Sequence, residues 1–435
     1  MRIGVIGTGH VGLVTCATLS ALGHEVVGND SDREKIDTIL SGRPWFHEPG
    51  LEELLARETE AGRLNFSYQI ADATSDADVV FLCVGTPPKA SGEASLVAVE
   101  SAARDVARHA GRRVVVVEKS TVPAGTARRV KRALILERPS DPVDVCSNPE
   151  FLREGHAVQD SLEPDRILVG TDTEHAREVM RAVYQPLTAK GVRLIETDIA
   201  TAELAKHACN AFLSMKISFI NAIARLCERA GGDVLQVAEV MGSDPRIGRE
   251  FLNAGLGYGG FCFPKDLAAF DALATELGYD FGLLREVAKI NDEAIDVAAQ
   301  QVKDAVWNIE GKRLAMWGLS FKPQTDDTRF SPALTLAKRL IDEGAEIVGY
   351  DPQAMSNAKA DLPELELAND IYDAAAGAHC VIVATEWSDF LAVDLERLKS
   401  VMAYPVIVDT RNLFDPQLIA DAGFWYYPVG RAPIT

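Results

Sequence analysis

The sequence predicts an α/β protein in which two doubly wound domains are joined by a long central helix and a helical region. Three observations lead to this prediction. Short apolar strands alternate with helical stretches near the N-terminus, an unbroken helical run begins at Ile199, and a second set of apolar strands begins at Leu314. Strands that alternate with helices form parallel sheets covered on both faces. With 435 residues, the chain has room for several domains of roughly 100–200 residues.

The first elements set out the first sheet. An apolar run over 2–6 predicts a strand, and the turn Gly7-Thr8-Gly9-His10-Val11-Gly12 follows it. Residues 13–22 are compatible with a helix, which leads to a second strand over 25–28. Further strands are expected at 79–84 and 114–117, with weaker patterns at 143–146 and 167–169. These elements predict a first domain over 1–198.

The run from 199 to 229 predicts one long helix, because it lacks proline and glycine and carries apolar residues on nearly every face. A helix that is apolar all round is expected to be buried. At about 1.5 Å per residue it would extend about 45 Å, long enough to join two domains and to contribute to a dimer interface. Helical patterns continue to about residue 308, which predicts a central dimerisation domain over 199–308.

A second α/β domain is predicted over 309–435. It begins with an apolar strand over 314–319, followed by a helix over 332–343 and a strand over 347–350. Later strands are expected at 380–384 and 406–409. This order matches that of a nucleotide-binding sheet.

Composition argues against several classes of partner. The 64 Asp plus Glu exceed the 44 Lys plus Arg, and the formal charge of −20 repels nucleic acids and anionic membranes. An anionic ligand therefore needs a local cationic pocket. The apolar run around 212–224 contains Lys216 and falls short of the ~18 apolar residues of a membrane span. Residues 2–23 superficially resemble a secretory signal, but the glycines at 4, 7, 9 and 12 weaken that interpretation.

Seven cysteines are scattered along the chain, and none forms a CxxC pair. Their odd number and spacing indicate neither a zinc site nor a full disulfide framework, so no metal site is expected. Thiols of this kind are typical of a reducing compartment, and the expected localisation is cytoplasmic.

The Gly7, Gly9 and Gly12 turn has the spacing of a dinucleotide-binding turn, in which glycine lets the backbone approach a pyrophosphate. Asp30 follows the second strand, where a carboxylate can accept a hydrogen bond from a ribose 2′-hydroxyl. A 2′-phosphate would be repelled by this carboxylate, so the turn predicts a Rossmann-like domain that binds NAD. The alternative is a glycine turn without a ligand.

Cys262 lies in a glycine-rich loop, Gly257-Tyr258-Gly259-Gly260-Phe261-Cys262, which is followed by Phe263-Pro264-Lys265-Asp266. So many glycines indicate a backbone that comes close to a ligand. A neighbouring cation favours the thiolate, so Cys262 is a candidate nucleophile. The ordinary alternative is a small residue of the core.

Two further groups of polar residues are candidates for catalysis. Lys206 and Asn210 lie four residues apart on the predicted long helix, and a buried ammonium needs a ligand, a carboxylate or an interface as its partner. A structural ion pair is the alternative for Lys206. Glu150 and Glu154 follow a strand, where they suit either base catalysis or simple stabilisation of a helix N-terminus.

Together these segments resemble the UDP-glucose/GDP-mannose dehydrogenase family over nearly the whole chain. Besides the glycine turn, the resemblance rests on segments 85–87, 118–123, 148–155, 202–210, 246–248, 257–266, 321–329 and 409–412. The strings Gly-Gly-x-Cys-Phe-Pro-Lys-Asp and Asn-Pro-Glu-Phe-Leu-x-Glu-Gly are the most specific ones. One position departs from many relatives, because Phe261 stands where they carry Ser, and this puts the identity of the sugar in doubt.

The resemblance implies a four-electron oxidation of a nucleotide-sugar C6 alcohol to a carboxylate with two NAD molecules, UDP-glucose being the expected substrate and UDP-glucuronate the product. Cys262 matches the family nucleophile, which forms a thiohemiacetal and then a thioester. By the same match, Lys206 and Asn210 stabilise the oxyanion, Asp266 and Thr121 arrange water and proton transfer, and Glu150 is a general base. The division of acid and base roles among these groups stays open.

The resemblance also implies binding residues and a homodimer, in which Arg246 reaches the sugar site of a neighbouring subunit. Lys322, with Arg246 and Arg411, supplies the local cationic pocket expected for the phosphates. The residues implied to bind NAD are Gly7, Gly9, Val11, Gly12, Asp30, Lys35, Thr86, Ser120, Thr121, Glu154, Lys265 and Arg329. Those implied to bind the substrate are Glu150, Phe151, Leu152, Arg153, Glu154, Lys206, Asn210, Arg246, Phe251, Leu252, Asn253, Ala254, Gly255, Tyr258, Gly259, Phe321, Lys322 and Arg411.

Three alternatives remain at this point. The same chemistry can act on GDP-mannose or on a UDP-amino sugar. A two-electron β-hydroxyacid dehydrogenase shares the first domain and the long helix, but it needs neither Cys262 nor a second nucleotide domain. A dinucleotide-binding scaffold without activity has no reason to keep Cys262, Lys206 and Asp266 together.

Overall fold

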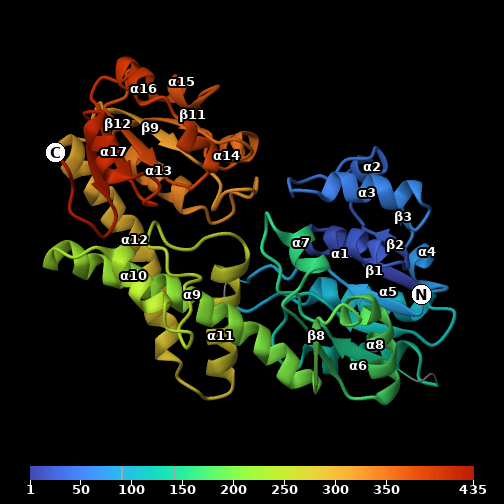
Figure 1. The fold of residues 1–435 in the computed structure, drawn as a ribbon. Coiled ribbons are helices and arrows are strands. Elements are labelled where there is room, and N and C mark those ends of the chain that lie inside the picture. The colour runs from blue at the N-terminus through green and yellow to red at the C-terminus, as the bar shows by residue number, and fades with distance from the viewer. Residues whose placement is uncertain (90–91, 141–142) are drawn as a thin grey trace. The chain divides into compact units, whose positions relative to one another are not determined.

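The chain folds into two units, each built around its own sheet (Figure 1). The computed structural model describes residues 1–89, 92–140 and 143–435. Unit 1 comprises Met1–Cys209 and Ala268–Tyr279, and unit 2 comprises Asn210–Leu267 and Asp280–Thr435. The predicted α/β fold class is confirmed. The division into three domains at 1–198, 199–308 and 309–435 stays a prediction.

Unit 1 contains an eight-stranded sheet in the order β3-β2-β1-β4-β5-β6-β7-β8. Its apolar residues pack into one cluster on each face, which accounts for the fully buried central strands. The strands are β1 (Arg2–Ile6), β2 (Glu25–Asn29), β3 (Leu64–Ser67), β4 (Val79–Leu82), β5 (Val115–Glu118), β6 (Asp144–Ser147), β7 (Arg166–Thr171) and β8 (Arg193–Thr197).

One prediction for this sheet is wrong, because it is not parallel throughout. Strands β6 and β7 pair antiparallel, with Cys146 opposite Thr171 and Ser147 opposite Gly170. Parallel neighbours need a crossover that returns the chain to the other end of the sheet. Between β6 and β7 the chain forms only the short helix α7 (Ala157–Leu162), which packs against α1 (His10–Ala21), and β7 then runs back beside β6.

Two of the other helices of unit 1 begin at side-chain caps. Asp32 accepts hydrogen bonds from Glu34 N and Lys35 N at the start of α2, and Thr173 accepts one from Ala176 N at the start of α8. The other helices of unit 1 are α2 (Arg33–Leu40), α3 (Leu51–Glu60), α4 (Ile70–Thr74), α5 (Val97–His109), α6 (Thr126–Glu137), α8 (Glu174–Thr188) and most of α11 (Cys262–Glu276).

The predicted long helix is α9 (Ile199–Ala230), which passes from unit 1 into unit 2 between Cys209 and Asn210. The expectation that it is buried all round is wrong. Four apolar side chains of α9 are exposed, namely Leu204, Phe212, Phe219 and Leu226. They recur at intervals of about two helical turns and therefore share one face, which the described elements of this chain leave exposed.

Unit 2 contains a six-stranded parallel sheet in the order β11-β10-β9-β12-β13-β14. Its strands are β9 (Arg313–Trp317), β10 (Glu346–Tyr350), β11 (Glu366–Leu367), β12 (Cys380–Val383), β13 (Val406–Asp409) and β14 (Trp425–Pro428). Its helices are α10 (Val234–Gly242), α12 (Gly282–Val306), α13 (Pro332–Asp342), α14 (Met355–Asp361), α15 (Ile371–Ala375), α16 (Leu395–Val401) and α17 (Pro416–Asp421), with a 3₁₀ turn at Ser388–Ala392.

Strands β3, β8, β11 and β14 have no counterpart among the predicted strands, and each of them is an edge strand. Interior strands such as β4 and β12 are buried at every residue, whereas β8 is partly or largely exposed along its whole length. An edge strand therefore lacks the continuous apolar run that marks a central strand.

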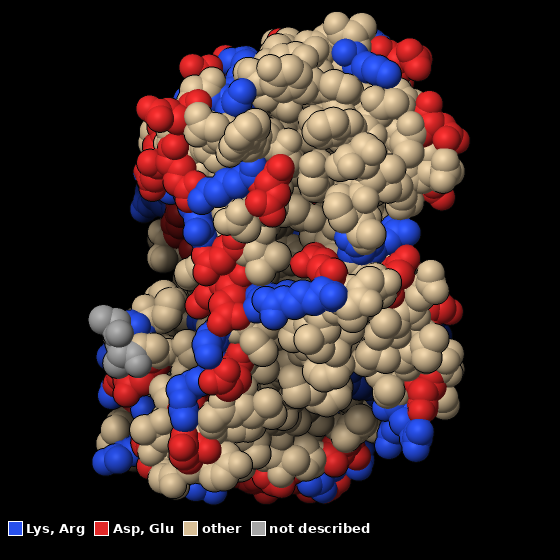
Figure 2. All heavy atoms as spheres, turned by 90° about the vertical axis from the view of Figure 1, so that its left-hand side faces the viewer, with Lys and Arg blue, Asp and Glu red and all other residues tan. Residues whose placement is uncertain are grey.

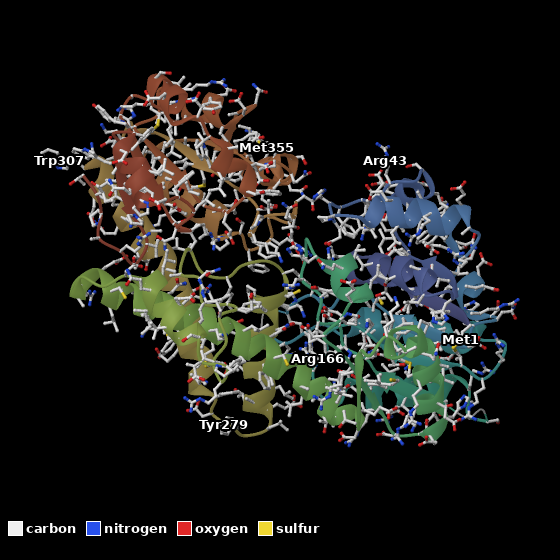
Figure 3. The ribbon with its side chains drawn as sticks, viewed as in Figure 1. Met1, Arg43, Arg166, Tyr279, Trp307 and Met355 are labelled. Carbon is white, nitrogen blue, oxygen red and sulfur yellow. The ribbon has the colours of Figure 1, made fainter. Side chains whose placement is uncertain are left out.

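The surface of the chain shows no separate acidic field on the face drawn in Figure 2, where acidic and basic side chains lie next to each other. Figure 3 shows Trp307 projecting from the end of α12, where its side chain is 95% exposed. Among the described residues, none of the helices is long and apolar enough to span a membrane.

Candidate active site

The dinucleotide turn connects β1 to α1 in unit 1, and close packing explains two of its glycines. Gly7 has a φ of 93°, and a Cβ on Gly12 would lie 1.8 Å from the carbonyl oxygen of Gly7. At Gly9 a Cβ would meet nothing within 4 Å, and no side chain caps the helix there. The space beside Gly9 at the start of α1 is thus open, an arrangement that fits the phosphates of NAD.

Asp30 directly follows β2 and holds the turn in place. Its Oδ2 accepts hydrogen bonds from Thr8 N at 2.8 Å and from Thr8 Oγ1 at 3.1 Å, and its Oδ1 accepts one from Asp32 N. The side chain is half-buried, so lone pairs remain for a ribose hydroxyl. Lys35 Nζ lies 3.8 Å from Asp32 Oδ2 and 4.6 Å from the ring centroid of Trp45.

We expect Asp30→Ala to weaken NAD binding by about 10-fold or more, because a charged hydrogen-bond acceptor is worth about 1.5–3 kcal/mol. Loss of the two bonds from Thr8 adds to this effect. Isothermal titration with NAD measures the dissociation constant. Asp32→Ala, which removes only the cap of α2, is the matched control. An unchanged NAD affinity in Asp30→Ala would remove Asp30 from the ribose site.

The carboxyl ends of β4 and β5 bring three of the predicted cofactor residues together. Thr86 Oγ1 donates a hydrogen bond to the carbonyl oxygen of Thr121 at 3.1 Å. Ser120 Oγ donates to the carbonyl oxygen of Val84 at 2.8 Å. In open α/β sheets, ligands bind just beyond the carboxyl ends of the strands, and β4 lies next to β1 in this sheet.

Glu118, the last residue of β5, was not among the predicted site residues. Its Oε1 accepts a hydrogen bond from Ser120 N at 3.1 Å, whereas its buried Oε2 has no hydrogen-bond partner among the residues that the structure describes. Burial raises the pKa of Glu118 to about 8, and the nearby charge of Glu203 acts in the same direction. Its place at the end of a buried strand is the signal that could have marked it as a candidate site residue.

The raised pKa of Glu118 predicts that stability falls as the pH rises. The unfolded carboxyl releases its proton near pH 4.5, but the folded one holds it to about pH 8, so the folded state binds more protons between these values. Glu118→Gln should therefore be more stable than the wild type at pH 8.5, by on the order of 2–4 kcal/mol, with no difference below pH 4.5.

Urea denaturation at pH 4.5 and pH 8.5 measures this effect on the free energy of unfolding. Glu137→Gln is the control, since Arg108 and Arg104 lower the pKa of Glu137 and its carboxyl stays ionised at pH 8.5 in both states. An equal pH dependence in the wild type and Glu118→Gln would contradict the prediction.

Lys206 and Glu150 form a buried ion pair in unit 1. Lys206 Nζ lies 3.1 Å from Glu150 Oε1, and the two side chains are 5% and 6% exposed. Glu150 Oε2 accepts a hydrogen bond from Leu152 N at 2.6 Å. The expectation that Lys206 meets a ligand, a carboxylate or an interface is thus met by a carboxylate, and a catalytic role for the pair stays a prediction.

Aromatic and cationic side chains surround this pair. The ring of Phe151 lies 5.3 Å from Lys206 Nζ and 4.1 Å from the guanidinium carbon of Arg166, which is labelled in Figure 3. Arg166 was not predicted, because it begins β7 and meets Phe151 only in the folded sheet. Arg153 points elsewhere, since its guanidinium binds both carboxylate oxygens of Asp160.

In unit 2, Cys262 is the first residue of α11 and is exposed. Asp266 follows one helical turn later and is buried. Its Oδ1 accepts a hydrogen bond from Lys265 Nζ at 2.6 Å, and its Oδ2 accepts one from Asn210 Nδ2 at 2.6 Å. The structure thus brings together three predicted site residues beside the candidate nucleophile.

Phe261, the departure from many relatives, lies between two predicted cofactor residues. Its ring centroid is 5.7 Å from Lys265 Nζ and 4.5 Å from the guanidinium carbon of Arg329. Arg329 also donates hydrogen bonds to both carboxylate oxygens of Asp327, from Nε to Oδ1 and from Nη2 to Oδ2. A serine at position 261 would lack these cation–π contacts.

Packing explains the glycines of the Cys262 loop. A Cβ on Gly257 would lie 2.4 Å from Asn291 Oδ1, and one on Gly260 would lie 2.8 Å from the ring of Phe321. Both residues also have positive φ angles. The loop is therefore held against α12 and against the segment after β9, rather than left mobile.

Among the remaining predicted substrate residues, the 251–259 segment lies near Arg411, whereas Arg246 does not join them. A Cβ on Gly255 would lie 3.2 Å from Arg411 Nη1, so the 251–259 segment lies against one predicted cation. Phe251 has a φ of 64°, an uncommon conformation that clusters at functional sites. Arg246 lies apart, with its side chain 86% exposed and its guanidinium bound to Asp244.

Comparison with known proteins gives matches along the whole chain. Three models of the UDP-glucose/GDP-mannose dehydrogenase family match, those of the NAD binding domain at residues 1–188, the central domain at 200–293 and the UDP binding domain at 315–416. A UDP-glucose 6-dehydrogenase of Rhizobium meliloti is 45% identical over 99% of this chain and 100% of its own length. One from Bacillus subtilis is 43% identical over 100% of this chain and 99% of its own length.

Solved structures give the same result. A UDP-glucose dehydrogenase from the archaeon Pyrobaculum islandicum superposes with a TM-score of 0.92 at 38% identity, covering 99% of this chain and 98% of its own. A UDP-D-ManNAc dehydrogenase from Pyrococcus horikoshii gives a TM-score of 0.87 at 28% identity, covering 99% of both chains.

Proposed function

Because the chain belongs to the UDP-glucose/GDP-mannose dehydrogenase family, we propose that it oxidises UDP-glucose to UDP-glucuronate through a covalent adduct on Cys262. The predicted oxidoreductase class and the predicted cofactor, NAD, are confirmed by the family matches. The observation that most supports the proposed mechanism is the exposed thiol of Cys262 beside the Asn210, Asp266 and Lys265 network.

Unit 1 offers the residues that would hold NAD. The open space at Gly9 would receive the phosphates, Asp30 would meet a ribose, and Ser120 and Thr121 lie just beyond the carboxyl ends of β4 and β5. When bound, NAD accepts hydride, and the net change is one alcohol, two NAD⁺ and one water converted into one carboxylate, two NADH and three protons.

The side chains of this protein would then act on the sugar. The ammonium of Lys206 and the amide of Asn210 stabilise negative charge on the C6 oxygen as the alcohol loses its proton and a hydride. The Cys262 thiolate adds to the resulting aldehyde, forming a C–S bond while the carbonyl oxygen takes a proton. The carbon then loses a second hydride and its hydroxyl oxygen loses the proton, which leaves carbon and sulfur joined as a thioester.

Water completes the reaction. Glu150 accepts a proton from the attacking water, and Asp266 and Thr121 orient that water and carry protons. The C–S bond then breaks, and Cys262 leaves as the thiolate that began the cycle. Lys206 holds Glu150 in place through the 3.1 Å ion pair.

A panel of UDP- and GDP-sugars tests this proposal through NADH formation. UDP-glucose should give two NADH per sugar, with UDP-glucuronate as the product. One NADH per sugar would favour a two-electron dehydrogenase, and binding of NAD without turnover of any sugar would favour a scaffold. Preference for GDP-mannose or a UDP-amino sugar would keep the chemistry and change the substrate.

We also propose that the enzyme is a homodimer. The exposed residues Phe212, Phe219 and Leu226 form an apolar stripe on one face of α9, and the exposed Arg246 is free of the glycine loop of its own unit. Light scattering tests this proposal, and a monomer across the working concentration range would contradict it. The proposed location is the cytoplasm, which fractionation of cells would test.

A further inference from the structure

Glu48 is a fully buried carboxylate that none of the proposed catalytic steps uses. It lies between α2 and α3, and its side chain has no exposed surface. Its Oε1 accepts a hydrogen bond from Ala157 N at 2.7 Å. Its Oε2 accepts one from Gly155 N at 2.8 Å and lies 3.0 Å from His10 Nε2. One side chain thus joins three segments that are far apart in the sequence.

His10 belongs to the dinucleotide turn, where it follows the open glycine Gly9 and begins α1. Its ring lies 4.5 Å from that of Phe46, centroid to centroid. Beside it, Trp45 Nε1 donates a hydrogen bond to the carbonyl oxygen of Thr8 at 2.9 Å. The segment 45–48 therefore contacts the turn on both sides of Gly9, at Thr8 and at His10.

On its other side, Glu48 contacts the loop that carries Glu150 and Glu154. Gly155, whose φ is 78°, and Ala157 donate their backbone N–H groups to Glu48, which fixes the end of this loop. Burial alone would lower the pKa of His10, but the hydrogen bond to Glu48 and the charges of Glu154 and Glu150 outweigh it, so the pKa is raised. A charged imidazolium strengthens the bond to the carboxylate.

We propose that His10 and Glu48 are positioning residues that couple the dinucleotide turn to the loop 150–155, so that binding of NAD holds this loop in its working position. Neither residue belongs to the proposed catalytic or binding sets. A ligand that orders the turn also orders His10, and the shared carboxylate transmits this order to the amides of Gly155 and Ala157. The inference rests on NAD binding at the turn and not on the identity of the sugar.

Hydrogen exchange of the intact protein, with and without saturating NADH, tests the link directly. In the wild type we expect NADH to slow the exchange of peptides spanning 150–157 by about 5-fold or more, in the range of typical couplings between sites. His10→Phe keeps an aromatic ring against Phe46 but cannot donate to Glu48, so NADH should slow exchange less than about 2-fold. His10→Gln restores a donor and should recover the protection.

Glu58→Gln is the matched control, since Glu58 is also a buried carboxylate of unit 1 but pairs with Arg57 and Arg63. It should keep the wild-type protection. Each variant is compared at NADH concentrations that saturate it by titration. If His10→Phe does not fold, Glu48→Gln replaces it, because the glutamine amide cannot accept both backbone bonds and the bond from His10.

Three results would overturn the proposal: no NADH-dependent protection in the wild type, full protection in His10→Phe or its Glu48→Gln substitute, or an equal loss in Glu58→Gln. Because no sugar is present, failure here is distinguishable from failure of the proposed reaction. A protein that shows the protection but oxidises no nucleotide sugar would keep the link and lose the proposed substrate.

Discussion

Cys262→Ser is expected to abolish formation of the acid, lowering UDP-glucuronate production by more than about 10³-fold, because a serine hydroxyl is a far weaker nucleophile than a thiolate. Cys262 begins α11, and a helix N-terminus favours an anion such as a thiolate. Binding of NAD should stay nearly unchanged, since the dinucleotide turn lies in unit 1. Product analysis by mass spectrometry and titration with NAD measure the two effects.

Mass spectrometry of quenched reactions adds a direct test of the adduct. The wild type should carry the sugar nucleotide on Cys262, and Cys262→Ser should show either no adduct or a trapped ester. Cys209→Ser, at a half-buried cysteine of α9, is the control and should retain activity. If NAD affinity falls as far as activity in Cys262→Ser, the thiol is structural.

Lys206→Met is expected to have the second largest effect, because it removes a charge that both stabilises the oxyanion and pairs with Glu150. Loss of an oxyanion-stabilising group should lower kcat by about 10²–10³-fold. Glu150 would also be left buried without its cation, which should lower the free energy of unfolding by about 3–5 kcal/mol. Steady-state kinetics and urea denaturation separate the two losses.

The double variant Lys206→Met/Glu150→Gln separates the charge balance of the ion pair from its proposed catalytic roles. With the buried charge removed, stability should return to within about 1 kcal/mol of the wild type or better, since buried ion pairs are replaceable by neutral groups. Activity should stay low, because neither the oxyanion nor the water has its partner. Recovery of activity together with stability would contradict catalytic roles for both Lys206 and Glu150.

The sequence predicted the interior of both sheets well, since central strands carry uninterrupted apolar runs. The strand over 406–409 was found at its predicted bounds, and the long helix ended within one residue of its prediction. The edge strands were missed because partial exposure removes that signal. The strand over 167–169 was found as β7, but its antiparallel direction was missed, because strand direction is set by the path of the connecting chain, here through α7, and not by the apolar pattern.

Site residues were predictable where a local motif carries the chemistry. The glycine turn with Asp30, the loop around Cys262, and Lys206 and Asn210 one turn apart on α9 are all patterns within short segments. Contacts between distant segments were not predictable in this way. The ion pair of Glu150 with Lys206, the contact of Arg166 with Phe151, and the orphaned oxygen of Glu118 appear only once the strands lie side by side.

By itself, the sequence determined which backbone turns can approach a ligand, which helix joins the two sheets, and which thiol is a candidate nucleophile, because these depend on residue type and spacing over a few turns. Only the tertiary structure decided which charges meet, as Glu48 shows by joining residues 10, 155 and 157 through one carboxylate. The physical reason is that a hydrogen bond or ion pair acts over about 3 Å, and only the folded path of the chain sets which groups come that close.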